Sequence, residues 1–91
     1  MNFKKTDREM TDRLFELISL LKSPEECEEL FYDLCTEREI EQMAQRIKAA
    51  QLLKEGKTYN QVKSQCDIST ATLSRVSRCL QYGKGYSKFL K

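Results

Sequence analysis

The stretch that decides the fold is TYNQVKSQCDISTATLSRV, which runs from Thr58 to Val76. It is rich in Ser, Thr, Gln and Asn, yet its few apolar residues recur at intervals that suit two short helices. Two such helices joined by a tight turn form a helix-turn-helix. The apolar residues are expected to hold the pair together while the polar residues face outward. These apolar residues are Val62, Cys66, Ile68, Leu73 and Val76.

Cap-forming residues mark the start of both helices. Thr58 and Gln61 are spaced as a capping box, which predicts a first helix that reaches about residue 65. Ser69 is a favourable N-cap for the second helix. We therefore expect the helix-turn-helix to span residues 58–80. The turn often has Gly where Asp67 stands, and Asp tolerates a left-handed backbone moderately well.

The second helix of the pair is predicted to read DNA. Its N-terminal end enters the major groove in such motifs. Hydroxyls and small apolar groups can contact base edges there, while nearby Lys and Arg contact phosphates. An ordinary αα-hairpin is the alternative, but it would not need a polar, acid-poor outer face. The predicted DNA-binding residues are Lys57, Lys63, Ser69, Thr70, Ala71, Thr72, Ser74, Arg75 and Arg78.

Charge is divided unevenly along the 91 residues. Residues 1–45 carry six Lys or Arg and twelve Asp or Glu, a net charge of −6. Residues 46–91 carry ten Lys or Arg and two Asp or Glu, a net charge of +8. A basic half favours contact with a polyanion such as double-stranded DNA. The alternative is that the halves complement each other, within the chain or across a dimer.

The rest of the chain is also predicted to be helical, which gives an all-α fold of about six helices in one domain over residues 1–91. The first helix is expected to end near Lys22, and Gly56 is expected to stop a long third helix. The predicted segments are N-terminal dimerisation helices over 1–35, a long core helix over 36–56, the helix-turn-helix over 58–80, and a C-terminal tail or short helix over 81–91.

The long core helix has apolar residues on more than one face. A helix buried on two sides in so small a chain indicates contact with a second subunit. A broad core within one chain is the alternative. The residues concerned are Ile40, Met43, Ala44, Ile47, Ala49, Ala50, Leu52 and Leu53.

Several classes of protein are not expected. No apolar run approaches the roughly 20 residues of a membrane span, and the start of the chain lacks a signal sequence, so a cytoplasmic protein is expected. The four cysteines have no CxxC spacing and the chain has no His, so no metal site is expected. Cys27 falls on an apolar helical face and is predicted to lie in the core. Without a nucleophile–base pairing, an enzyme is not expected either.

The segment CTEREIEQMAQRIKAAQLLKEGKTYNQV…STATLSRVSRCL, from Cys35 to Leu80, resembles the Trp-repressor superfamily. It is most similar to the YerC/YecD branch. The resemblance implies an intertwined homodimer in which long helices cross between subunits and each subunit presents one recognition helix. Two such helices lie about one DNA turn, roughly 34 Å, apart. The operator of this transcriptional regulator would then be near-palindromic.

The resemblance also implies an effector site. In the Trp repressor two arginines and a threonine help to hold tryptophan, and the matching residues here are Thr36, Arg46 and Arg75. A tryptophan corepressor is not expected, because Val76 replaces a small Gly and would crowd the ligand. No cofactor is expected, and a small-molecule effector of unknown identity stays open. The alternative function is a protein–protein docking module without specific DNA binding.

Overall fold

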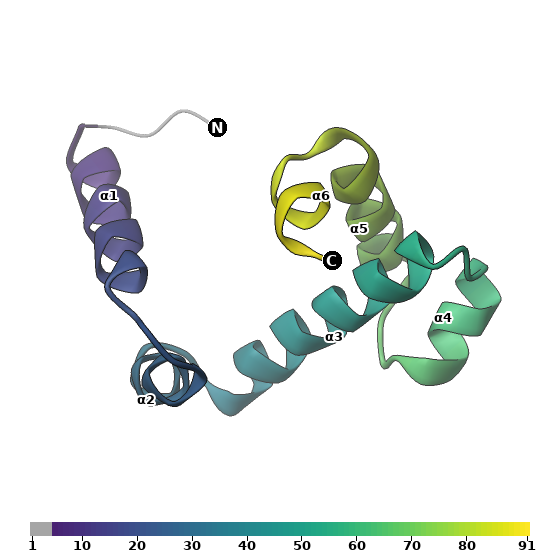
Figure 1. Ribbon diagram of the computed structural model, residues 1–91, viewed down its shortest axis with the longest axis horizontal. Helices are drawn as coiled ribbons and strands as arrows, with labels where there is room; N and C mark the ends of the chain where they lie inside the picture. The colour runs from purple at the N-terminus through teal and green to yellow at the C-terminus, as the bar shows by residue number, and fades with distance from the viewer. Residues whose placement is uncertain (1–4) are drawn as a thin grey trace. The chain divides into compact units, whose positions relative to one another are not determined.

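The computed structural model describes residues 5–91, and over that range every regular element is an α-helix. This confirms the predicted all-α fold (Figure 1). The six helices are α1 (Lys5–Ser19), α2 (Pro24–Leu34), α3 (Glu37–Lys54), α4 (Tyr59–Gln65), α5 (Thr70–Tyr82) and α6 (Gly85–Phe89). They fall into two compact units, one ending at Thr36 and the other running from Glu37 to Lys91. The prediction of a single domain over residues 1–91 stays a prediction.

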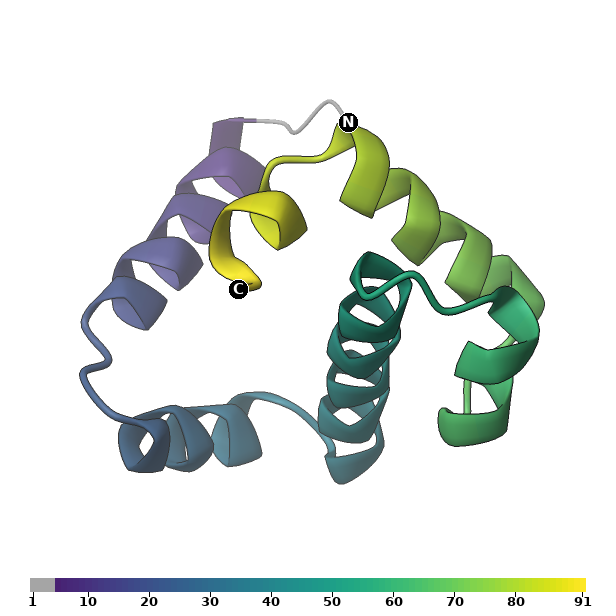
Figure 2. The ribbon, with the colours of Figure 1, turned by 45° about the vertical axis from the view of Figure 1, so that its right-hand side comes forward.

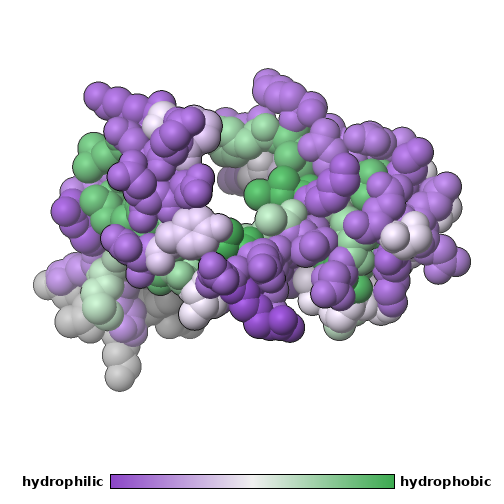
Figure 3. All heavy atoms as spheres, turned by 90° about the horizontal axis from the view of Figure 1, so that it is seen from below, coloured by the Kyte–Doolittle hydropathy of each residue, from purple (hydrophilic) through white to green (hydrophobic). Residues whose placement is uncertain are grey.

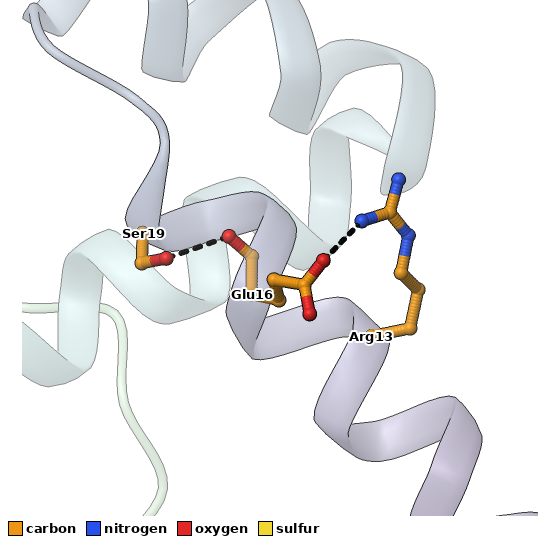
Figure 4. Close-up of polar contacts among 3 residues, drawn as sticks. All are labelled: Arg13, Glu16 and Ser19. Atoms are coloured by element: carbon orange, nitrogen blue, oxygen red, sulfur yellow. Dashed lines mark hydrogen bonds and ion pairs between the residues drawn. The ribbon is translucent and has the colours of Figure 1, made fainter.

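Helix α1 is shorter than predicted. It ends at Ser19, so the expected end near Lys22 is wrong. The Ser19 hydroxyl donates to the Glu16 carbonyl at 2.6 Å (Figure 4) and so competes for an acceptor of the helical ladder. The Leu20 N–H then donates to the Leu17 carbonyl, three residues back, at 3.1 Å, which tightens the final turn. An exposed ion pair joins Arg13 to Glu16 at 2.6 Å on the same helix.

Helix α2 begins directly after an N-cap. The Ser23 hydroxyl accepts a hydrogen bond from the Glu26 N–H at 3.1 Å, and Pro24 occupies the first turn. The Glu26 carboxylate in turn accepts from the Lys22 N–H at 2.8 Å. The prediction that Cys27 lies in the core is wrong, because its side chain is exposed. Its helix carries an apolar stripe, yet no residue of α2 is buried.

Helix α3 ends as its sequence predicts. Gly56 has a φ of +91°, a left-handed conformation that side chains disfavour. The Lys57 N–H donates to the Leu52 carbonyl and the Gly56 N–H to the Leu53 carbonyl, both at 3.0 Å. This pair of bonds is a Schellman motif, which satisfies the last carbonyls of the helix. The chain then turns directly into α4.

The core of the second unit is a cluster of seven buried residues, which we call the helix-turn-helix core. They are Ala49, Ala50, Leu52, Val62, Cys66, Leu73 and Val76. Helix α3 supplies one face, and α4 and α5 pack against it as a pair joined by a short turn (Figure 2). The prediction that sparse apolar residues hold this pair is confirmed for Val62, Cys66, Leu73 and Val76, while Ile68 packs on the edge of the core.

The C-terminal residues close over this core. The predicted tail or short helix is the helix α6, which packs against α5. Tyr86 and Leu90 contact the helix-turn-helix core. The Lys54 ammonium donates to the Leu90 carbonyl, and the Gln51 amide donates to the Lys91 carbonyl at 3.5 Å. Phe89, by contrast, is 74% exposed.

One face of α3 is not covered within its own unit. The side of Ala49, Ala50 and Leu52 is buried, whereas Ile47 is 52% exposed. Figure 3 shows green apolar side chains reaching the surface among purple hydrophilic ones. On α3 the exposed apolar residues are Ala44 and Ile47, and the contact of this face with another subunit stays a prediction.

Candidate nucleic-acid interface

The helix-turn-helix core fixes which side chains point outward. Leu73 and Val76 press α5 against α3, and Val62 does the same for α4. The intervening positions of α5 are therefore left at the surface. All the predicted DNA-binding residues are exposed except Thr72, which is half-buried. The exposed ones are Lys57, Lys63, Ser69, Thr70, Ala71, Ser74, Arg75 and Arg78.

Hydroxyls organise the N-terminus of α5. The Ser69 Oγ accepts from the Thr72 N–H at 3.1 Å and the Ser69 hydroxyl donates to the Thr72 Oγ1 at 2.9 Å. The first bond is the predicted N-cap, which satisfies one of the free N–H groups at a helix start. Two of the predicted DNA-binding side chains thus support the helix and hold each other in place.

A second contact joins the two helices of the pair. The Lys63 ammonium on α4 donates to the Thr70 hydroxyl oxygen on α5 at 2.6 Å. These residues lie seven positions apart, on either side of the turn. The structure therefore brings together a predicted phosphate contact and a predicted base contact.

The turn between α4 and α5 uses a residue that the sequence analysis missed. The Asp67 N–H donates to the Gln45 Oε1 of α3 at 3.1 Å. Among the described residues only Gly56 has a positive φ, so the expected tolerance of Asp67 for a left-handed backbone is not used. Gln45 instead satisfies the backbone of the turn. Its position four residues before the buried Ala49 was the available signal, since both share one helical face.

A polar pocket of about 310 Å³ lies beside this turn, between α3 and the N-terminus of α5. Of the three predicted effector residues, only Arg46 lines this pocket. Arg75 is not among the lining residues, and Thr36 is the last residue of the other unit. Val76 is 2% exposed within the core, so its methyl groups fill space. The pocket is lined by Arg38, Glu41, Gln42, Gln45, Arg46, Asp67, Ile68, Ser69 and Thr72.

Two further classes of site are absent from residues 5–91. None of the helices there is long and apolar enough to cross a membrane. The same part of the chain holds no cluster of three or more His, Cys, Asp or Glu suited to a metal ion. The four cysteines are free thiols.

Known proteins share both the sequence and the fold. The Trp repressor protein family matches residues 9–91. The uncharacterized protein YerC of Bacillus subtilis (strain 168) is 51% identical over 72 residues, which cover 79% of this chain and 69% of that protein.

Two solved structures are similar to this chain in fold and in sequence. A crystal structure from Staphylococcus aureus, provisionally assigned as a Trp repressor, has a TM-score of 0.83 and 41% identity, covering 96% of this chain and 88% of that one. A TrpR-like protein from Eubacterium eligens ATCC 27750 has a TM-score of 0.81 and 40% identity, covering 87% and 82%. From the matched residues, the shared fold and the identity to YerC, the chain belongs to the Trp repressor family and to its YerC-like branch.

Proposed function

We propose that this protein is a sequence-specific DNA-binding transcriptional regulator. The observation that carries the proposal is the construction of α4 and α5. Val62, Leu73 and Val76 hold the pair from inside, while the N-terminus of α5 presents polar, uncharged and basic side chains to the solvent. The end of a helix built in this way fits the major groove.

The charge of the second unit favours the same function. Residues 57–91 carry seven Lys or Arg and a single acidic residue, Asp67. Such a surface attracts the phosphate backbone and makes the affinity depend on salt. Arg75 and Arg78 lie on the exposed side of α5, so they are suited to contact phosphates next to the groove. Because the proposed function requires contact with DNA, we also propose a cytoplasmic location.

The regulator is proposed to act as a homodimer. The apolar side chains of α1 and α2 are exposed or only half-buried, with Met10 65% and Phe15 61% exposed. Exposed apolar side chains of this size mark an interaction surface. A second copy of the chain, with its own recognition helix, would give two reading heads about one DNA turn, roughly 34 Å, apart.

Tryptophan is not proposed as a corepressor. Val76 belongs to the helix-turn-helix core, so making room for an indole at that position would cost packing. The threonine and arginines of the expected site are Thr36, Arg46 and Arg75, of which Arg46 alone lines the pocket beside α5. The identity of any effector stays open. An enzyme is not proposed.

The test is a selection of bound duplexes from a random pool, followed by affinity measurements on the winner at several salt concentrations. We expect a near-palindromic winner and a log affinity that falls linearly against log salt. Arg75→Ala should weaken binding by roughly tenfold without changing the unfolding curve. The matched control is Arg13→Ala, which removes the same charge from α1 and should leave affinity unchanged.

Two results would count against the proposal. One is a pool without a winner, or with binding that ignores sequence and salt. The other is equal loss of affinity in Arg75→Ala and Arg13→Ala. Either would favour a protein–protein docking module, and the exposed apolar side chains of α1 and α2 would then be the surface to examine.

A further inference from the structure

The contact between Lys63 and Thr70 has an unusual position. It bridges α4 and α5 at the end of α5 that would enter a groove, with the ammonium 2.6 Å from the hydroxyl oxygen. Both side chains are exposed. The recorded ion pairs of the described residues join Arg8 to Asp12 and Arg13 to Glu16, all on α1. The positive charge of Lys63 is therefore not neutralised by a carboxylate.

The direction of this bond follows from chemistry. A lysine ammonium has three donors and no acceptor, so Thr70 must accept. The hydroxyl hydrogen of Thr70 is then turned away from Lys63, and two ammonium hydrogens remain for other partners. The pair thus presents hydrogen-bond donors and a positive charge to whatever lies in front of it.

Base edges in the major groove differ in how they meet such a donor pair. Guanine offers two acceptors, O6 and N7, side by side. Adenine and cytosine each place an amino donor in the groove, which would face the ammonium with its hydrogens. Thymine offers one acceptor, O4, beside its methyl group, so only one of the two donors would find a partner. Thr70 is the first residue of α5 and is followed by the small Ala71, so a base edge can approach closely.

We propose that Lys63 and Thr70 act together as one donor unit that reads a guanine in each half of the operator. Lys63 is then a specificity-determining residue and not only a phosphate contact. The inference rests on the proposed function, since it requires that α5 enters the major groove. It also goes beyond it, because it names the base and the two side chains that read it.

The experiment is a double-variant cycle on the duplex selected by the unchanged protein. Affinity is measured for that duplex and for every single-base replacement, with the unchanged protein, Lys63→Ala, Thr70→Val and the double variant. We expect one symmetric guanine position at which replacement costs roughly tenfold. Either single variant should abolish that preference. The double variant should lose no more affinity for the selected duplex than a single variant does.

Two controls separate this role from others. Thr70→Ser keeps the hydroxyl and should keep the guanine preference, whereas Thr70→Val has nearly the same shape without it. Lys48→Ala removes an exposed lysine of α3. Any loss of affinity that it causes should be the same for the selected duplex and for every single-base replacement. Unfolding curves of the variants should coincide with that of the unchanged chain, because all three side chains are exposed.

Three outcomes would overturn the inference. If Lys63→Ala weakens all duplexes equally, the lysine contacts phosphate only. If no guanine position responds to Thr70→Val, the hydroxyl does not read a base. Both outcomes leave the proposed function intact. A pool without any winner would instead overturn the proposed function, and this inference with it.

Discussion

The two units of the chain use the same helical periodicity and reach opposite states of burial. In the unit from Glu37 to Lys91, seven apolar or thiol side chains are buried and three helices share them. In the unit that ends at Thr36, none of the side chains described from residue 7 onward is fully buried. An apolar stripe thus specifies a helix face, but a second surface is needed to bury it.

The difference in burial also matches the two roles that we propose for the units, DNA binding and dimerisation. A buried core holds α5 without help from a partner, because Leu73 and Val76 fix its contact with α3. The α1–α2 unit retains exposed apolar side chains, which the proposed homodimer would cover. The basic and acidic halves follow the same division, since net charge is −6 over residues 1–45 and +8 over residues 46–91.

The largest expected effect comes from opening the helix-turn-helix core. Leu73 is fully buried, so Leu73→Ala should lower the free energy of unfolding by about 2–5 kcal/mol. Urea denaturation followed by circular dichroism measures this. The matched control is Leu34→Ala, an exposed leucine of α2. A smaller loss for Leu73→Ala than for Leu34→Ala would contradict the assignment of the core.

A somewhat smaller effect should follow from removing an exposed aromatic of α1. If Phe15 lies between two copies, Phe15→Ser should cost about 1.5–3 kcal/mol per subunit in dimer stability. Sedimentation over a range of concentrations measures the shift toward monomer. Helix content should be unchanged at concentrations where the chain is still dimeric. Equal dissociation constants for Phe15→Ser and the unchanged chain would place the interface elsewhere.

The capping box of α4 should contribute less. The Thr58 Oγ1 accepts from the Gln61 N–H at 3.2 Å, and the Gln61 Oε1 accepts from the Thr58 N–H at 2.8 Å. Thr58→Ala should therefore destabilise the chain by about 1 kcal/mol. Thr58→Ser, which keeps the acceptor, is the control and should lose much less. If serine and alanine behave alike, the hydroxyl is not responsible.

The smallest effect is expected on the acidic face of α2. Glu28 is exposed and has no recorded ion pair among the described residues, so Glu28→Gln should change the free energy of unfolding by less than about 0.5 kcal/mol. Its effect on DNA affinity should be equally small. A change above 1 kcal/mol in thermal or urea unfolding would reveal a structural role for this face.

Much of the helix-turn-helix could be predicted from the sequence, because its signals are local. The starts of the helices are indicated by the cap residues Thr58, Gln61 and Ser69. The buried sides are indicated by the spacing of Val62 and Leu73. The Gly56 stop is also local, since it depends on one left-handed residue. These features need no knowledge of the rest of the fold.

Other features could not be predicted because they depend on distant or missing surfaces. Cys27 sits on an apolar stripe, but its own unit does not bury it. The bond from Asp67 to Gln45 joins residues 22 positions apart, and the bond from Lys63 to Thr70 depends on the crossing of α4 and α5. Such contacts follow from tertiary geometry, which helical periodicity does not specify.

The most direct test of the account is the stoichiometry of the complex with the selected duplex. The duplex is held well above the dissociation constant, and the protein is titrated into it while fluorescence anisotropy is recorded. The account predicts saturation at two chains per duplex, with a complex that contains twice the 10.7 kDa mass of one chain. Saturation at one chain per duplex would contradict it, because a single recognition helix would then read the whole site.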